Sequence, residues 1–228
     1  MKTNSLTLFT RILHFLPVIG IGWLAAASPA FAQKDAKAKD LLDKSSAMLN
    51  QSAGISVAFT MNINDDVQKI KQSFEGRMLV KAAKFFLETP DQTVWFDGKT
   101  QWVYAPSVEE VTVLTPQPQD IRILNPIAVF ELYKTNCDYK YNGEKIDGQK
   151  RSVQDISLFL RDKKEDVKQV DIQLSAGDGM PVFFRIVYKN KSEYKIYVTT
   201  YQTNVTLSDS QFVFDKKKYP QAEVNDLR

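Results

Sequence analysis

The sequence predicts a mainly β protein in which one helix precedes a long series of antiparallel strands. From Ile55 onward, β-branched and aromatic residues recur in short runs with a two-residue period, and turn residues separate these runs. Before that point, the segment from Ala36 to Asn50 places apolar residues on one helical face and charged residues on the other. Because nearly all the links between runs are short, successive strands are expected to pair antiparallel.

The first 32 residues have the pattern of a secretory signal peptide. Lys2 and Arg11 precede an apolar stretch, and Ala30 and Ala32 supply the small residues that a signal peptidase requires. The apolar stretch is shorter than the roughly 20 residues that span a bilayer, which favours cleavage over retention as an anchor. We therefore expect one domain at 33–228 that is exported across the inner membrane and released into the periplasm.

Turn residues divide the chain beyond the first helix into twelve predicted strands. Asp97-Gly98 is the strongest hairpin signal, because glycine tolerates the positive φ of a tight two-residue turn. A proline-rich stretch leads into Ile121–Tyr133, which is expected to form one or two short helices between the sixth and seventh strands. The predicted strands are Ile55–Ile63, Ile70–Val80, Phe85–Glu88, Thr93–Phe96, Thr100–Tyr104, Glu110–Leu114, Tyr139–Glu144, Arg151–Leu160, Val167–Leu174, Pro181–Tyr188, Lys195–Tyr201 and Gln211–Phe214.

The residue types exclude most enzymatic chemistry. The only histidine, His14, leaves with the signal peptide, and Cys137 is the only cysteine. A Ser-His-Asp or Cys-His site needs an imidazole to move a proton, and zinc sites without histidine or several cysteines are rare. Cys137 is expected to be a small buried hydrophobic residue. A pair of carboxylates in a cleft, as in a glycoside hydrolase, is the catalytic alternative that stays open.

The charge of the mature chain argues against a nucleic-acid partner. Removal of Lys2 and Arg11 lowers the formal net charge from +3 to about +1. No dense basic block then remains that would follow a phosphate backbone. We expect a monomer without a cofactor, with no catalytic residue and no nucleic-acid partner.

Several predicted strands are apolar at consecutive positions, so both of their faces must be covered. Examples are the runs at 78–80, 85–87, 94–96 and 182–184. An antiparallel sheet with one wet face would instead alternate cleanly between apolar and polar residues. Two arrangements satisfy this pattern: packing on a second sheet with a filled core, or a curved sheet that wraps helices and leaves an apolar hollow.

One set of motifs resembles the periplasmic outer-membrane lipoprotein carrier (LolA) family. The most specific piece is Asp97-Gly98-Lys99-Thr100-Gln101-Trp102-Val103-Tyr104-Ala105-Pro106, with Phe74-Glu75-Gly76 upstream and Phe212-Val213-Phe214 near the end. The resemblance implies a single strongly curved antiparallel sheet, an incomplete barrel of about 11–12 strands, with helices covering its concave face. It also implies a periplasmic carrier that shields the acyl chains of lipoproteins, loaded by an inner-membrane transporter and unloaded at an outer-membrane receptor.

Six residues of the double-sided strands are predicted to bind acyl chains in such a hollow. They are Phe59, Met61, Leu79, Phe86, Trp95 and Trp102. The LolA resemblance fails at one place, because the family's Arg-Pro step after the Gly76 strand is replaced by Lys81-Ala82-Ala83-Lys84. In the family that arginine is associated with holding the helical lid closed. Either Lys81 or Ala82 takes its position here, and Lys81 is the predicted site of lid or release control. This departure motivates an alternative function, a lipid-sensing or interaction domain that signals through a protein partner.

Overall fold

The computed structural model describes residues 35–117, 129–135, 137–162 and 166–228. The predicted signal peptide and most of the predicted helical insert at 121–133 lie outside these residues. The described helices are α1 (Ala36–Gln51), α3 (Val129–Thr135) and two short 3-10 helices, η1 (Asp209–Phe212) and η2 (Lys216–Lys218). The strands are β1 (Ile55–Asp65), β2 (Ile70–Lys81), β3 (Lys84–Glu88), β4 (Thr93–Phe96), β5 (Gln101–Ala105), β6 (Glu110–Leu114), β7 (Cys137–Ile146), β8 (Ser152–Leu160), β9 (Val167–Ser175), β10 (Pro181–Tyr188), β11 (Glu193–Thr203) and β12 (Glu223–Asp226).

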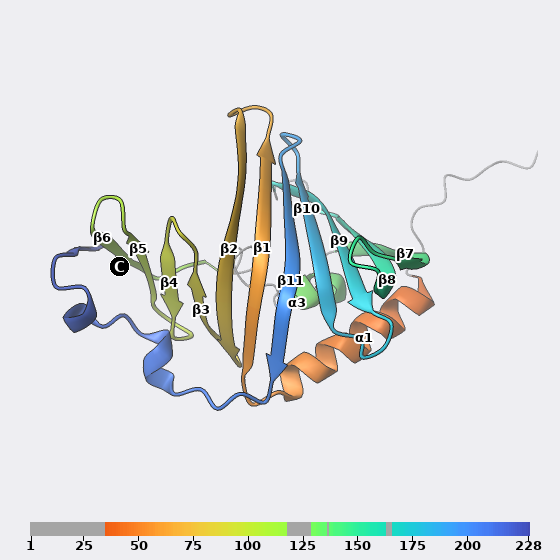
Figure 1. Ribbon diagram of the computed structural model, residues 1–228, viewed down its shortest axis with the longest axis horizontal. Coiled ribbons are helices and arrows are strands. Elements are labelled where there is room, and N and C mark those ends of the chain that lie inside the picture. The colour runs from red at the N-terminus through yellow and green to blue at the C-terminus, as the bar shows by residue number, and fades with distance from the viewer. Residues whose placement is uncertain (1–34, 118–128, 136, 163–165) are drawn as a thin grey trace, which may run out of the picture. The chain divides into compact units, whose positions relative to one another are not determined.

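All twelve strands form one sheet in the order β12-β6-β5-β4-β3-β2-β1-β11-β10-β9-β8-β7. Neighbours pair antiparallel, except that β12 pairs parallel with β6. β12 and β7 are the two edges, so the sheet curves without closing, and α1 and α3 pack against it (Figure 1). The predicted fold class, an incomplete antiparallel barrel with helices on its concave side, is confirmed.

Asp35, the N-cap residue of α1, also joins this helix to β7, one of the two edge strands of the sheet. The Asp35 carboxylate accepts hydrogen bonds from the backbone N–H groups of Lys37, at 2.9 Å, and Ala38, at 3.2 Å. Its other oxygen accepts from the Tyr141 N–H of β7, at 3.1 Å. The pKa of Asp35 is lowered, first by the Tyr141 bond and then by the Ala38 bond. The same carboxylate therefore starts α1 and satisfies a backbone donor of an edge strand.

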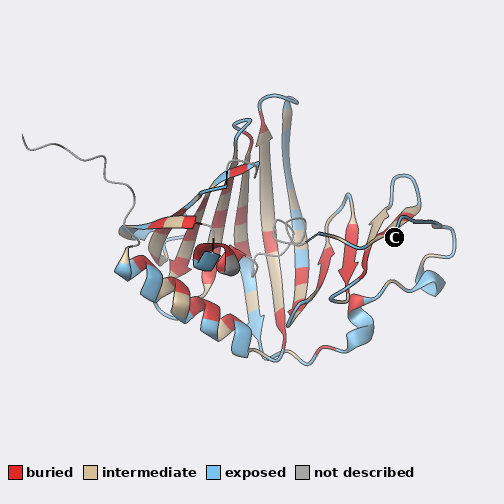
Figure 2. Cartoon of the chain, turned by 180° about the vertical axis from the view of Figure 1, so that it is seen from behind, coloured by how far each residue is buried: buried red, intermediate tan, exposed pale blue. Residues whose placement is uncertain are grey.

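The sheet buries apolar residues on both of its faces. The concave face, α1 and α3 share one core that includes Leu42, Phe85, Phe130 and Ile172. Buried residues occupy the middle of the strands and one side of α1, whereas the tip of the β1–β2 hairpin is exposed (Figure 2). A second cluster lies on the opposite, convex face, where Phe86 and Trp95 pack with buried residues of the C-terminal segment.

One predicted strand, near the C-terminus, is wrong. Residues 211–214 were expected to form a strand, but Asp209–Phe212 is the 3-10 helix η1, and Phe212 is fully buried beside Phe86 and Trp95. Aromatic residues at 212 and 214 have the spacing of a strand but serve here to cover the convex face: the Phe214 ring lies 5.5 Å from that of Trp95. The twelfth strand is instead β12, which is exposed along its whole length and offers no alternation for sequence analysis to detect.

We predict that Phe212→Ala destabilises the fold much more than Val213→Ala. Removing a fully buried phenylalanine ring costs about 3–5 kcal/mol of unfolding free energy, whereas the Val213 side chain is 39% exposed and its loss should cost less than about 0.5 kcal/mol. Urea unfolding of the two variants measures the difference. Similar unfolding midpoints would contradict the packing of this segment on the convex face.

Candidate functional site

An apolar pocket of about 300 Å³ lies on the concave face of the sheet. This volume is at the lower end of the range of roughly 300–1,000 Å³ that is usual for small-molecule sites. Its polar members gather at the β3–β4 turn and at two tyrosines. The described lining residues are Leu49, Ile55, Val57, Phe59, Met61, Ile63, Phe74, Met78, Val80, Leu87, Thr89, Asp91, Gln92, Phe130, Pro181, Phe184, Ile186, Tyr194, Ile196, Val198 and Tyr201.

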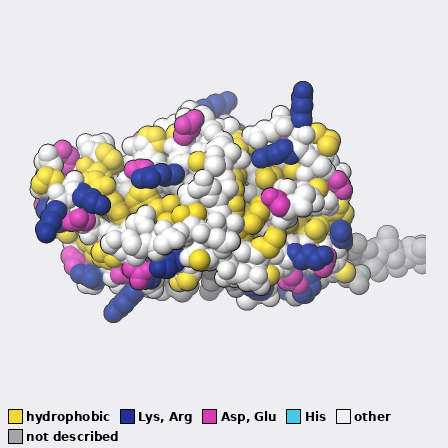
Figure 3. Space-filling view, turned by 60° about the horizontal axis from the view of Figure 1, so that its bottom comes forward, with side chains coloured by type: hydrophobic (Ala, Val, Ile, Leu, Met, Phe, Trp, Pro, Cys, Tyr) yellow, Lys and Arg dark blue, Asp and Glu magenta, His cyan; other side chains and the backbone are white. Residues whose placement is uncertain are grey.

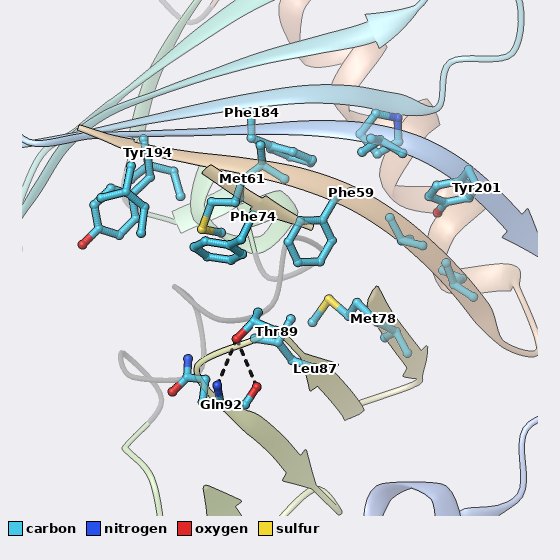
Figure 4. A pocket seen from close by; sticks show the side chains of 18 of the residues that line it. Phe59, Met61, Phe74, Met78, Leu87, Thr89, Gln92, Phe184, Tyr194 and Tyr201 are labelled. Carbon is cyan, nitrogen blue, oxygen red and sulfur yellow. Dashed lines mark hydrogen bonds between the residues drawn. The ribbon is translucent and has the colours of Figure 1, made fainter. Parts of the chain in front are cut away.

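The pleat of the central strands builds the pocket wall. Side chains of a strand alternate between faces, so the odd-numbered residues of β1 line the pocket from Ile55 to Ile63. Across the strand pairs, Met61 lies opposite Phe74 of β2 and Ile196 of β11. Figure 4 shows Met61 and Phe74 side by side, with Phe59 next to them. Four central strands therefore present one continuous apolar surface.

Two helices contribute to the pocket and are joined to each other. Leu49 of α1 and Phe130 of α3 are lining residues. The Tyr133 hydroxyl of α3 donates a hydrogen bond of 2.7 Å to Asp43 of α1. The pKa of Asp43 is lowered, first by the hydrogen bond from Lys39 and then by that from Tyr133. The carboxylate therefore stays ionised and holds the two helices together over the concave face.

Gly76 leaves room for the aromatic ring at the centre of the pocket. Phe59 lies directly opposite Gly76 in the β1–β2 pair. A Cβ at position 76 would meet the Phe59 ring, 2.8 Å from Cε2 and closer to Cζ, and would lie 3.0 Å from the Glu88 carbonyl oxygen. The glycine of the Phe74-Glu75-Gly76 motif is thus explained by the close approach of Phe59, and the ring in turn fixes the shape of the pocket.

Hydrogen bonds already satisfy part of the polar lining. The Thr89 hydroxyl donates to the Gln92 carbonyl at 3.0 Å and accepts from the Gln92 N–H at 3.2 Å, which closes the β3–β4 turn (Figure 4). Tyr194 lines the pocket and contacts Tyr188, with tilted rings whose centroids are 4.9 Å apart. Burial raises the pKa of Tyr188 to about 12, so its hydroxyl is neutral at physiological pH. Apart from Asp91, the described lining is uncharged.

The six predicted acyl-binding residues do not share one surface. Phe59 and Met61 line the pocket, and their role in binding stays a prediction. The other four are on the convex face, where Leu79 pairs with Phe86, Phe86 with Trp95, and Trp95 with Trp102 in successive strands. Directly paired residues point to the same side of a sheet. The grouping of Leu79, Phe86, Trp95 and Trp102 with Phe59 was therefore wrong.

Lys81 also belongs to the convex side. Its ammonium group donates to the Leu207 carbonyl and to Asp209, both at 2.9 Å. Lys84 forms a second ion pair with Asp209, at 2.9 Å, and the two lysines lower the pKa of that carboxyl group. These partners lie in the C-terminal segment, so the contacts of Lys81 favour an anchor for that segment over the predicted control of the helical lid.

Sequence analysis missed most of the pocket wall. The missed residues from β10 and β11 are Pro181, Phe184, Ile186, Tyr194, Ile196, Val198 and Tyr201. Five of these residues, from Phe184 to Val198, are at even positions, and the apolar run 182–184 predicts a strand that is covered on both faces. The alternation does not reveal which face of the sheet holds the pocket, because consecutive residues of such a run point to opposite faces and all of them are apolar.

The described parts of the chain offer neither a metal cluster nor a spanning helix. No group of three or more histidine, cysteine, aspartate or glutamate residues among them is arranged to hold a metal ion. None of their helices has the length and apolar character needed to cross a membrane. Cys137 is buried, as predicted. On the face shown in Figure 3, lysine and arginine side chains are interspersed with acidic ones.

A large unclosed antiparallel sheet with an apolar pocket between its concave face and its helices defines a half-barrel protein with an internal binding site. The sequence profile of the family described as outer membrane lipoprotein carrier protein LolA matches residues 28–178, more than half of the chain. The chain belongs to this family.

Individual relatives agree with this assignment. The chain is 25% identical over 196 residues to the outer-membrane lipoprotein carrier protein of Idiomarina loihiensis, covering 84% of this chain and 90% of the relative. It is 28% identical to the protein of that name from Haemophilus influenzae strain PittEE, covering 76% and 81%. A conserved protein of Thermus thermophilus of known crystal structure has a similar fold, with a TM-score of 0.56 at 12% identity, covering 83% of this chain and 99% of that one.

We predict that Gly76→Ala changes both the pocket and the stability of the protein. The added methyl group forces the Phe59 ring to move, and overpacking of this kind costs about 1–3 kcal/mol. Gly148→Ala is the matched control, because a Cβ at that position meets no atom within 4 Å. Urea unfolding and binding of a hydrophobic fluorescent dye measure the two effects. Unchanged dye binding in Gly76→Ala would show that Phe59 does not shape the pocket.

Proposed function

We propose that this protein is a periplasmic carrier that shields the acyl chains of lipoproteins in the concave pocket and delivers them from the inner to the outer membrane. The observation that carries the proposal is the pocket itself, an apolar hollow between a curved sheet and two helices. Family membership supports the cargo, since the relatives are named as carriers of outer-membrane lipoproteins. Phe59 and Met61, at the centre of the wall, are proposed acyl-binding residues.

The energetics of the task fit a binding site without a catalytic group. Each methylene removed from water contributes about 0.8 kcal/mol, so a chain of about ten methylenes gains on the order of 8 kcal/mol when it is fully buried. That gain requires no hydrolysis and no cofactor. Binding of this strength also means that release needs a receptor that competes for the chains. We infer that an inner-membrane transporter loads the protein and an outer-membrane receptor unloads it.

The helices offer the movable wall that loading requires. α1 and α3 contribute Leu49 and Phe130 to the pocket and are joined by the Tyr133–Asp43 hydrogen bond. A single hydrogen bond to a charged group contributes about 1.5–3 kcal/mol, which is small against the binding of an acyl chain. In this proposal the Tyr133–Asp43 bond, and not Lys81, holds the lid closed at rest.

The proposal predicts that Met61→Lys removes bound lipid and Thr60→Lys does not. Both residues are on β1, but Met61 lines the pocket and Thr60 points to the convex face. A charge in the apolar wall should lower the amount of co-purified acyl lipid by about tenfold or more, because an ammonium group is costly to desolvate. Lipid extraction and mass spectrometry of protein purified from the cell envelope provide the measurement. Absence of lipid from the wild-type protein, even when lipoproteins are overproduced, would contradict the proposal.

The carrier role and the lipid-sensing alternative are separated by complementation. A carrier should restore lipoprotein sorting in cells depleted of their own carrier, and the Met61→Lys variant should fail to do so. A domain that only senses lipid would bind it equally well but would leave sorting defective. That second outcome would favour the signalling function over transport.

A further inference from the structure

Tyr201 faces the pocket because β11 contains a bulge. The lining residues of this strand are first Tyr194, Ile196 and Val198, which alternate regularly. Between the Phe59–Val198 and Ala58–Thr200 pairs the register shifts by one residue, so Thr199 is extra, and Tyr201 then pairs with Val57. Without the bulge, strict alternation would turn Tyr201 to the convex face. A local irregularity of the sheet therefore aims this one tyrosine into the apolar pocket.

The Tyr201 hydroxyl is buried and has no hydrogen-bond partner among the described residues. Two other tyrosine hydroxyls have partners: Tyr133 donates to Asp43 and Tyr141 to Gln154. Burial raises the pKa of Tyr201, which keeps its hydroxyl protonated and able to donate. Most buried polar groups in proteins are satisfied, so an exception in a binding pocket requires an explanation.

We infer that Tyr201 is a specificity-determining residue whose hydroxyl donates a hydrogen bond to the ester or amide carbonyl that links an acyl chain to its headgroup. The inference rests on the proposed acyl-carrier function and adds the polar contact that recognises the ligand. A carbonyl oxygen is a neutral acceptor, so it satisfies the hydroxyl without bringing a charge into the apolar pocket. A free carboxylate fits poorly, because the only charged residue in the described lining is Asp91, which is itself acidic.

The position of Tyr201 gives the ligand a direction. Figure 4 shows Tyr201 and Tyr194 at opposite ends of the pocket, with Phe59, Met61 and Phe74 between them. A carbonyl held by Tyr201 directs the acyl chain along these residues toward Tyr194 and leaves the headgroup at the end where Ile55 pairs with Thr203. The Tyr201 hydroxyl is buried in the ligand-free protein. Flexible lining side chains such as Met78 must therefore move before a carbonyl can reach it.

The test is Tyr201→Phe, with Tyr197→Phe as the matched control, because Tyr197 is on the same strand, points to the convex face and packs on Phe183 outside the pocket lining. The probes are 1-monopalmitoylglycerol, which has an ester carbonyl, and 1-O-hexadecylglycerol, which has the same chain length and no carbonyl. Tyr201→Phe should weaken binding of the ester about three- to tenfold, the value of one net hydrogen bond, and leave binding of the ether within about twofold. Tyr197→Phe should change neither affinity.

Three results would overturn the inference. Equal losses for the ester and the ether in Tyr201→Phe would assign the tyrosine to packing, and unchanged ester binding would show that the hydroxyl is not used. A clear fall in the melting temperature of ligand-free Tyr201→Phe would reveal a structural role, since loss of an unpaired hydroxyl should leave stability equal or higher. If the wild-type protein bound neither probe, the acyl-carrier proposal would fail together with the inference.

Discussion

The alternation of side chains across the strands is the constraint on which the rest of this structure depends. The runs 78–80, 85–87 and 94–96 within β2, β3 and β4 are apolar at every position, so both faces of the sheet must be covered there. Different segments of the chain cover the two faces. Helices α1 and α3 lie over the concave face and leave a pocket, whereas the C-terminal segment packs directly on the convex face of β3, β4 and the neighbouring strands.

This division explains why a chain with so many buried aromatic residues still has an internal hollow. On the convex side, Phe86, Trp95, Phe214 and Tyr219 form a filled cluster, with the Trp95 and Tyr219 rings 5.5 Å apart. Lys81 and Lys84 hold the start of the covering segment through Asp209. On the concave side, the described helices α1 and α3 contribute Leu49 and Phe130, and the apolar pocket lies between them and the sheet.

On β7 to β10 the convex face carries a row of polar side chains that is ordered by a different interaction. Ser157 donates to Asp171 at 2.6 Å, and Arg185 pairs with the same carboxylate at 3.0 Å, which links β8, β9 and β10. Asn142 of β7 extends this row through a 2.9 Å hydrogen bond to Ser157. The outward residues of these strands therefore need no covering segment. Only the aromatic half requires the C-terminal extension, which ends by adding β12 beside β6.

The sequence by itself determined the order of the described elements and placed its single histidine at position 14. Eleven of the twelve strands were predicted near their observed bounds, because two-residue periodicity and turns such as Asp97-Gly98 depend on local backbone chemistry. Tertiary structure decided which face each apolar residue serves. Trp95 and Trp102 were indistinguishable from Phe59 in sequence, since burial against the C-terminal segment and burial in the pocket select the same residue types. Tertiary structure also decided the orientation of Tyr201. That orientation depends on a one-residue shift in strand pairing, which cannot be read from the hydrophobic pattern.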